Sequence, residues 1–179
     1  MSCLTKEPRP DQTYSAVAPP SPHMRIHLLS GPIHSGKTTR LAAWSAGRSD
    51  VAGILSPLRT DGRTFIDIRS GACFPMEVGI TAPDAVRIGR YAFAPEAFAW
   101  AVERLLANAP RPDVRWLIID EIGPLELLGE GFDGVLRDII RLNRPGLNLV
   151  LVVREGLAEQ VIGHYDLARL NPRVFGEEQ

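Results

Sequence analysis

Gly31-Pro32-Ile33-His34-Ser35-Gly36-Lys37-Thr38 matches the phosphate-binding loop pattern G-x-x-x-x-G-K-[ST] and decides the fold of this 179-residue chain. Of the 20 lysine and arginine residues only two are lysines, Lys6 and Lys37. A compact ammonium group on a flexible stem can reach the β- and γ-phosphates, where a planar guanidinium fits poorly. The lysine at position 37 therefore indicates a nucleoside triphosphate site.

The segments on either side of this loop have the patterns that the motif requires. Residues 25–30 form a short apolar run of strand length, and residues 38–46 predict a helix that buries Leu41, Ala42, Trp44 and Ala46 before Gly47 ends it. The backbone amides at the start of this helix are expected to hold the phosphates. The predicted phosphate-binding residues are Gly31, Pro32, Ile33, His34, Ser35, Gly36, Lys37, Thr38 and Thr39. The alternatives are a structural turn for the loop and a solvent-facing spacer role for His34.

A second motif, Trp116-Leu117-Ile118-Ile119-Asp120-Glu121, has the form of a Walker B segment, with four apolar residues before two acids. Magnesium is a hard cation that prefers oxygen ligands. The Thr38 hydroxyl and the Asp120 carboxylate are therefore the predicted Mg²⁺ ligands, and Glu121 is predicted to orient or deprotonate the attacking water. The alternative for the acid pair is a helix cap or a surface pair. Glu126, a third acid nearby, is open to a role in the site or to a solvated loop position.

Composition excludes several classes of protein. The formal net charge is −1, whereas a nucleic-acid-binding protein usually carries a basic excess, so no nucleic-acid partner is expected. No apolar stretch approaches the roughly 20 residues that span a bilayer, so no membrane association is expected. Only Cys3 and Cys73 are present, which favours a reducing compartment and predicts a cytoplasmic location. No protein partner can be named from the sequence.

Strand and helix patterns alternate along the rest of the chain. Apolar runs predict buried strands at 51–56, 114–120 and 147–153, and apolar periodicity predicts helices at 95–108, 132–142 and 156–164. The helix at 95–108 is expected to bury Phe98, Val102, Leu105 and Leu106. The Asp61-Gly62 pair predicts a hairpin in the middle of the chain. The predicted fold class is α/β: a mostly parallel P-loop NTPase sheet with helices on both faces and an inserted antiparallel β meander.

The first 23 residues contain five prolines and no apolar periodicity. We expect residues 1–23 to form a Pro-rich, flexible tail and residues 24–179 to form a single domain. The tail has two interpretations, a mobile extension without function or a segment that docks onto the body or a partner.

A family resemblance follows from the two motifs together. The segment Asp120-Glu121-Ile122-Gly123-Pro124-Leu125-Glu126-Leu127 and the loop at 31–39 resemble the THEP-type nucleoside triphosphatases. The likeness extends from about Met24 to Val153. It implies a P-loop fold with an added strand between the two Walker strands, and magnesium-dependent hydrolysis of ATP, GTP and other triphosphates. Residues 53–59 resemble the second strand of this family and the arginine that follows it.

The predicted catalytic residues are Lys37, Glu121, Arg59 and Arg154. Arg59 is proposed from the family likeness, and Arg154 is proposed because it follows a buried strand and should emerge at the ligand edge of the sheet. Either arginine would stabilise charge in the transition state. Two other functions stay open: a phosphotransferase that moves the γ-phosphate to a small molecule or nucleotide, and a regulatory module that binds a triphosphate without hydrolysing it.

Overall fold

The computed structural model describes residues 23–60, 62–79, 84–88 and 91–176. The predicted Pro-rich tail lies outside the described residues, apart from His23, and its separation from a single domain stays a prediction. Within the described part, every helix is too short or too polar to span a bilayer.

The helices and strands follow the order that the sequence predicts. The strands are β1 (Arg25–Gly31), β2 (Val51–Leu55), β3 (Leu58–Arg59), β4 (Gly62–Asp67), β5 (Cys73–Pro75), β6 (Val86–Ile88), β7 (Tyr91–Phe93), β8 (Trp116–Ile122), β9 (Asn148–Arg154) and β10 (Arg173–Val174). The helices are α1 (Lys37–Ser45), α2 (Pro95–Asn108), α3 (Pro124–Leu127), α4 (Asp133–Leu142), α5 (Ala158–His164) and the 3₁₀ helix η1 (Leu167–Leu170). The short elements α3, η1, β6 and β10 are not predicted from the sequence.

Eight strands of the described chain form one sheet, in the order β10-β1-β9-β8-β2-β4-β3, with β5 paired to β4. The strands from β10 to β2 are parallel. Strand β9 lies between β1, which leads into the phosphate loop, and β8, which ends in the acid pair. This is the added strand that the family resemblance implies, and the prediction of a mostly parallel α/β sheet is confirmed.

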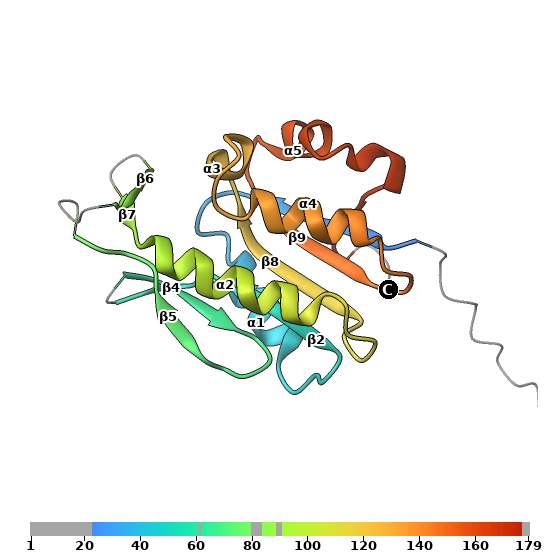
Figure 1. Cartoon of the computed structure of the whole chain (residues 1–179), viewed down its shortest axis with the longest axis horizontal. Helices are drawn as coiled ribbons and strands as arrows, with labels where there is room; N and C mark the ends of the chain where they lie inside the picture. The colour runs from blue at the N-terminus through green and yellow to red at the C-terminus, as the bar shows by residue number, and fades with distance from the viewer. Residues whose placement is uncertain (1–22, 61, 80–83, 89–90, 177–179) are drawn as a thin grey trace, which may run out of the picture.

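The antiparallel part of the sheet begins at β4. Strand β4 pairs antiparallel with β2, β3 and β5, so the β3–β4 hairpin and the meander are confirmed. Strands β6 and β7 form a separate antiparallel pair, which extends from the body at the start of α2 (Figure 1). The meander thus places residues of β4 beside the parallel strands that carry the two motifs.

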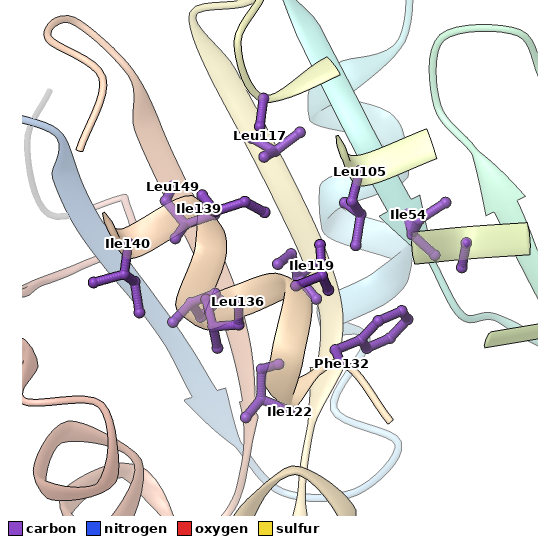
Figure 2. Packing of buried hydrophobic residues seen from close by; sticks show 14 of the residues in the cluster. Ile54, Leu105, Leu117, Ile119, Ile122, Phe132, Leu136, Ile139, Ile140 and Leu149 are labelled. Carbon is purple, nitrogen blue, oxygen red and sulfur yellow. The ribbon is translucent and has the colours of Figure 1, made fainter. Parts of the chain in front are cut away.

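Helices cover both faces of the sheet, with α1 on one face and α2 and α4 on the other (Figure 1). Alternate residues of β8 contact the two layers: Leu117 and Ile119 pack in the larger cluster with α2 and α4, and Ile118 packs with Leu41 of α1. Figure 2 shows Leu136, Ile139 and Ile140 of α4 facing the sheet, in the same cluster as Ile119 of β8. Burial on both faces explains why β8 reads as a continuous apolar run rather than an alternating one.

The register of the parallel strands brings the site residues to one edge. Gly31, at the end of β1, pairs with Arg154, at the end of β9. Asp120 of β8 pairs with Val152 of β9, two residues before Arg154. Because parallel strands end at the same edge, the phosphate loop, the acid pair and Arg154 all emerge there, as expected for a ligand site in an open α/β sheet.

Candidate functional site

The phosphate loop joins β1 to α1 and closes around the side chain of Lys37. The Lys37 ammonium donates to the carbonyl oxygens of Gly31 and Pro32, both at 2.8 Å. Gly36 caps the start of α1 with φ 82°, a left-handed conformation that favours glycine. The loop therefore presents the amino-terminal end of α1, with its unpaired amides and positive dipole end, beside the only lysine of the described chain.

Asp120 contacts the phosphate loop directly. The Thr38 hydroxyl donates to Asp120 Oδ2 at 2.7 Å, and the Ser56 backbone N–H donates to the same oxygen at 3.1 Å. Asp120 is only 1% exposed. Burial raises the pKa of this carboxyl, and the Thr38 and Ser56 hydrogen bonds oppose that rise. The Asp120 carboxyl is therefore held directly beneath the phosphate loop.

These groups fit a magnesium ion that is shared with a bound phosphate. Mg²⁺ in phosphate-transfer sites is held by one or two protein oxygens together with substrate phosphates and water, rather than by a full cage of side chains. Thr38 and Asp120 supply two such oxygens within hydrogen-bond distance of each other. The described residues contain no cluster of three or more histidine, cysteine or acidic side chains, so they offer no alternative cage.

The Glu121 side chain forms an ion pair with Arg154, another catalytic candidate at the end of a parallel strand. The Arg154 Nε and Nη2 groups both donate to Glu121 Oε1, at 3.0 and 2.9 Å. No donor to Glu121 Oε2 is recorded from the described part of the chain. The pair is partly exposed, with side-chain exposures of 36% for Arg154 and 22% for Glu121. The arginine thus orients the carboxylate while one of its oxygens stays accessible.

A cavity of about 330 Å³ joins the loop to these charged groups. It is lined by Ile33, His34, Ser35, Gly36, Lys37, Thr38, Thr39, Ser56, Pro57, Leu58, Arg63, Glu121 and Arg154. Gly31 and Pro32 do not line the cavity, but their carbonyl oxygens accept hydrogen bonds from Lys37, which does. Asp120 does not line it either and accepts a hydrogen bond from Thr38, which does. The fold therefore brings together the two motifs and Arg154 from β1, α1, β8 and β9.

Arg59 lies outside this cavity. It is exposed on β3, where its guanidinium is 3.9 Å from the sulfur of Cys73. Arg63, the next arginine along the chain, lines the cavity in its stead. Sequence reasoning missed Arg63 and Ser56. Ser56 could have been found, because it follows a strand adjacent to β8, whereas Arg63 depends on the return of the chain through the hairpin.

Glu126 is not a solvated loop carboxylate. It is 3% exposed, and its two oxygens accept the backbone N–H groups of Gly123 at 2.7 Å and Phe132 at 3.2 Å. Burial raises its pKa to about 7, although these hydrogen bonds oppose the rise. Glu126 therefore fixes the loop that follows the acid pair.

A Gly-rich loop between a strand and a helix, with an acidic strand end hydrogen-bonded to it, defines the molecule as a P-loop nucleotide-binding protein. The comparison with known proteins narrows this class. Residues 26–167 match the NTPase family, and the chain belongs to this family, in its THEP-type branch. The resemblance inferred from the two motifs is therefore confirmed.

One similar protein is the nucleoside-triphosphatase THEP1 of Hyperthermus butylicus, which is 38% identical over 86 residues. That match covers 48% of this chain and 41% of the relative, so the chain spans about two fifths of the relative's length. The solution structure of a human cancer-related nucleoside triphosphatase superposes with a TM-score of 0.62 and 25% identity, covering 86% of this chain and 90% of the other.

A crystal structure of THEP1 from Aquifex aeolicus has a TM-score of 0.61 and 20% identity. It covers 83% of this chain and 87% of the other. At this identity the likeness shows the fold alone, and it agrees with the parallel sheet and the inserted strands described above.

Proposed function

We propose that this chain is a magnesium-dependent nucleoside triphosphatase that hydrolyses ATP, GTP and other triphosphates to the diphosphate and phosphate. The observation that carries the proposal is the 2.7 Å hydrogen bond between Thr38 and Asp120. It joins the phosphate loop to an acidic strand end 82 residues away, at the edge where the cavity lies. Membership of the NTPase family supports the same activity.

The phosphates bind to the backbone amides of residues 33–39, at the start of α1. In the structure Lys37 is bound to two loop carbonyls, so a triphosphate competes with those carbonyls for its ammonium group. Lys37 then neutralises the β- and γ-phosphates. His34, exposed and with φ 63°, lies at the rim of the loop as a spacer in this arrangement.

The Thr38 hydroxyl and the Asp120 carboxylate would hold Mg²⁺ at this site through their oxygen atoms. When bound, the ion neutralises the charge that develops on the β- and γ-phosphate oxygens. Ser56 supports this arrangement through its backbone N–H, which keeps the Asp120 carboxylate oriented beneath the loop.

Glu121 orients the attacking water and accepts its proton. The ion pair with Arg154 supports this role, because it fixes the carboxylate through one oxygen. Arg154 and Arg63 both line the cavity and stabilise the charge of the transferring phosphoryl group, whereas Arg59 is a weaker candidate because it does not line the cavity and contacts Cys73 instead. A cytoplasmic location remains part of the proposal and is supported by the free, exposed thiol of Cys73.

Substitutions of Lys37 and Glu121 test these roles. Lys37→Ala and Glu121→Gln are expected to lower phosphate release from Mg·ATP and Mg·GTP by about a hundredfold or more, because each removes a group aimed at the reacting phosphate. Lys37→Arg is expected to restore little activity, because the guanidinium does not fit the loop. Phosphate release is measured under steady-state conditions with a panel of triphosphates, with and without EDTA.

Glu130→Gln is the matched control, since Glu130 is an exposed carboxylate near the acid pair that does not line the cavity. It should release phosphate at the rate of the unmodified chain. Undiminished turnover in Lys37→Ala or Glu121→Gln would refute the assigned role, and turnover that persists in EDTA would refute the dependence on magnesium.

A further inference from the structure

A second cavity, of about 250 Å³, lies directly beside the proposed phosphate site. The two cavities share four lining residues, Ser56, Arg63, Glu121 and Arg154. Three of these residues are charged, and Glu121 is the group that we assign to the attacking nucleophile. The second cavity therefore opens at the position where the γ-phosphate reacts.

Away from this shared mouth the wall is mostly apolar and aromatic, with Glu126 as the one charged residue among the described lining residues. Four phenylalanines and a methionine, supplied by the meander, β7, α2 and the start of α4, form most of it: Phe65, Phe93, Phe98, Phe132 and Met76. Phe65, Phe93 and Phe132 are almost fully buried, and Phe98 is partly buried. The wall is therefore a fixed part of the core and not a surface groove.

The rings hold one another in place. The Phe65 centroid is 5.4 Å from those of Phe98 and Phe132, and the Phe98 and Phe132 centroids are 5.5 Å apart. The interplanar angles of these three pairs lie between 55° and 77°, in the tilted and edge-to-face range that aromatic pairs prefer. A ring-shaped guest would thus meet a pre-organised aromatic wall, which reduces the entropy cost of its binding.

Water binds poorly in a cavity with such a wall. An apolar cavity of about 150 Å³ lined by aliphatic and phenylalanine side chains stays dry and takes up benzene, whereas a buried water needs two to four polar partners. Most polar groups of this cavity lie at the shared mouth; away from it Glu126 is the one charged residue in the described wall, and its two oxygens accept the Gly123 and Phe132 backbone N–H groups. A guest with an apolar ring and one polar end therefore matches the cavity better than water alone.

The base of the bound triphosphate does not suit this position. Lys37, Thr38 and Asp120 fix the β- and γ-phosphates, and Glu121 faces the γ-phosphorus in the proposed arrangement. The base is attached through the ribose to the α-phosphate, at the opposite end of the molecule. A cavity that opens at Glu121 and Arg154 therefore lies beyond the γ-phosphate.

We propose that this cavity binds a small ring-bearing alcohol, which accepts the γ-phosphoryl group in place of water. The alcohol oxygen forms a bond to the γ-phosphorus, the bond from that phosphorus to the β–γ bridging oxygen breaks, and the nucleoside diphosphate leaves. The alcohol proton passes to the Glu121 carboxylate. This inference rests on the proposed binding of a triphosphate and adds a phosphotransferase activity to it.

The experiment measures nucleoside diphosphate and free phosphate separately during turnover of Mg·ATP by the full chain. The probes are benzyl alcohol, 4-fluorobenzyl alcohol and 2-naphthalenemethanol at millimolar concentration. Transfer to an alcohol makes diphosphate exceed free phosphate, and the missing phosphate is recovered as the organic phosphate ester. Diphosphate and phosphate that remain equal with every alcohol would overturn the proposal.

Phe98→Leu and Phe74→Leu form a matched pair for this test. Both phenylalanines are partly buried and pack against another aromatic ring, but only Phe98 lines the cavity. Phe98→Leu is expected to weaken binding of 4-fluorobenzyl alcohol, followed by ¹⁹F NMR, by about two- to tenfold and to lower the excess of diphosphate accordingly. Phe74→Leu should leave both values unchanged. Equal effects of the two substitutions would contradict the assignment of the cavity.

The same measurements distinguish two further outcomes. Absence of phosphate release in the alcohol-free reaction contradicts the proposed hydrolysis, whereas the transfer to alcohol is judged independently by the ester product. If the base of the substrate occupies the cavity instead, Phe98→Leu raises the KM for ATP without alcohol and ¹⁹F binding is abolished by the triphosphate, which would also overturn the proposal.

Discussion

At the scale of single residues, two buried carboxyl groups at and just after the end of β8 are held by different partners. Asp120 accepts a side-chain hydroxyl from another element, so its hydrogen bond with Thr38 can be exchanged for a metal ligand bond. Glu126 accepts two backbone N–H groups of its own loop, which cannot move without breaking α3 and the start of α4. Burial raises the pKa of both carboxyls. Asp120 is thus tied to the phosphate loop, whereas Glu126 is tied to the backbone of its own loop.

The raised pKa of Glu126 predicts a pH dependence of stability. Its pKa is about 7 in the folded chain against an ordinary value of 4.5, so the folded state binds the proton more tightly. The stabilising effect is fully present below pH of about 4.5 and is lost as the pH rises through about 7. This difference corresponds to about 3 kcal/mol in the free energy of unfolding.

Glu126→Gln is expected to remove this dependence, because the amide does not ionise. Urea unfolding at several pH values between 4 and 8 checks it: the free energy of unfolding of the variant should fall less with rising pH than that of the unmodified chain. The exposed Glu130→Gln variant should follow the unmodified chain. Parallel curves for the unmodified chain and Glu126→Gln would contradict the prediction.

At the scale of helices and strands, the packing of α2 differs from the expectation. The sequence predicts a buried face of Phe98, Val102, Leu105 and Leu106, but Leu106 is 46% exposed. Leu105 is buried as expected, and Phe98 and Val102 are partly buried against the core. The other buried residues are Ala97, Ala101 and Asn108. The small alanines let α2 lie close to the sheet. A prediction based on large apolar side chains misses these alanines, because a helix that packs closely on a sheet needs small side chains at the contact as well as large apolar ones.

In helix α1, too, the buried residues differ from those that the sequence predicts. Ala42 and Ala46, which were expected in the buried stripe, are exposed, whereas Leu41 is buried and Trp44 is partly buried against Trp116. Ser45 completes the buried face. The existence of α1 and α2 follows from their sequences, but the face that each buries depends on where the neighbouring layer lies.

Strand β2 depends on a close backbone approach at Gly53. Its φ is +126°, and a Cβ at this position would lie 2.1 Å from the Ile118 carbonyl oxygen of β8. Gly53→Ala is therefore expected to lower the free energy of unfolding by about 3 kcal/mol or more, because both the backbone conformation and the β2–β8 spacing must change. Urea unfolding measures this loss.

Gly134 of α4 provides the control for Gly53. A Cβ at Gly134 meets no atom within 4 Å. Gly134→Ala should therefore stabilise the chain, by up to about 1 kcal/mol, because alanine has the higher helix propensity. A loss of stability in Gly53→Ala no larger than that of an ordinary surface substitution would disprove the close-packing argument.

At the scale of the whole molecule, one edge of the sheet collects groups from distant parts of the chain. The loop after β1, the end of β8 and the end of β9 meet there, and the antiparallel β4 brings Arg63 and Phe65 to the same place. Ligand binding at this edge therefore connects α1, α3 and the meander. We expect such a ligand to stabilise the whole fold.

This coupling predicts a rise in Tm on binding. A non-hydrolysable triphosphate with Mg²⁺, at about one hundred times its Kd, should stabilise the folded chain by about 2.7 kcal/mol. For a chain of this size that shift amounts to about 5–10 °C in Tm. Scanning fluorimetry with the analogue, with and without EDTA, measures it. Lys37→Ala should lose most of the shift, and an equal shift in EDTA would contradict shared binding of the metal and the phosphates.

The sequence by itself determined the strand–loop–helix unit at Lys37, the buried strand ending in Asp120 and Glu121, and the α/β order of elements. These features depend on local spacing: glycines at fixed intervals, apolar runs of strand length and helical periodicity. The prediction that Thr38 and Asp120 lie together also followed, because parallel strands that end at one edge must bring their following residues together.

Only the tertiary structure decided that Arg63 lines the cavity and Arg59 does not, that Glu126 clamps its own loop, and that four phenylalanines line a second cavity beside that of the phosphate loop. These contacts join residues from different elements, through the return of β4 and the packing of α2 and α4 against the sheet. Their positions depend on how whole layers pack, so no spacing within one segment of the sequence encodes them.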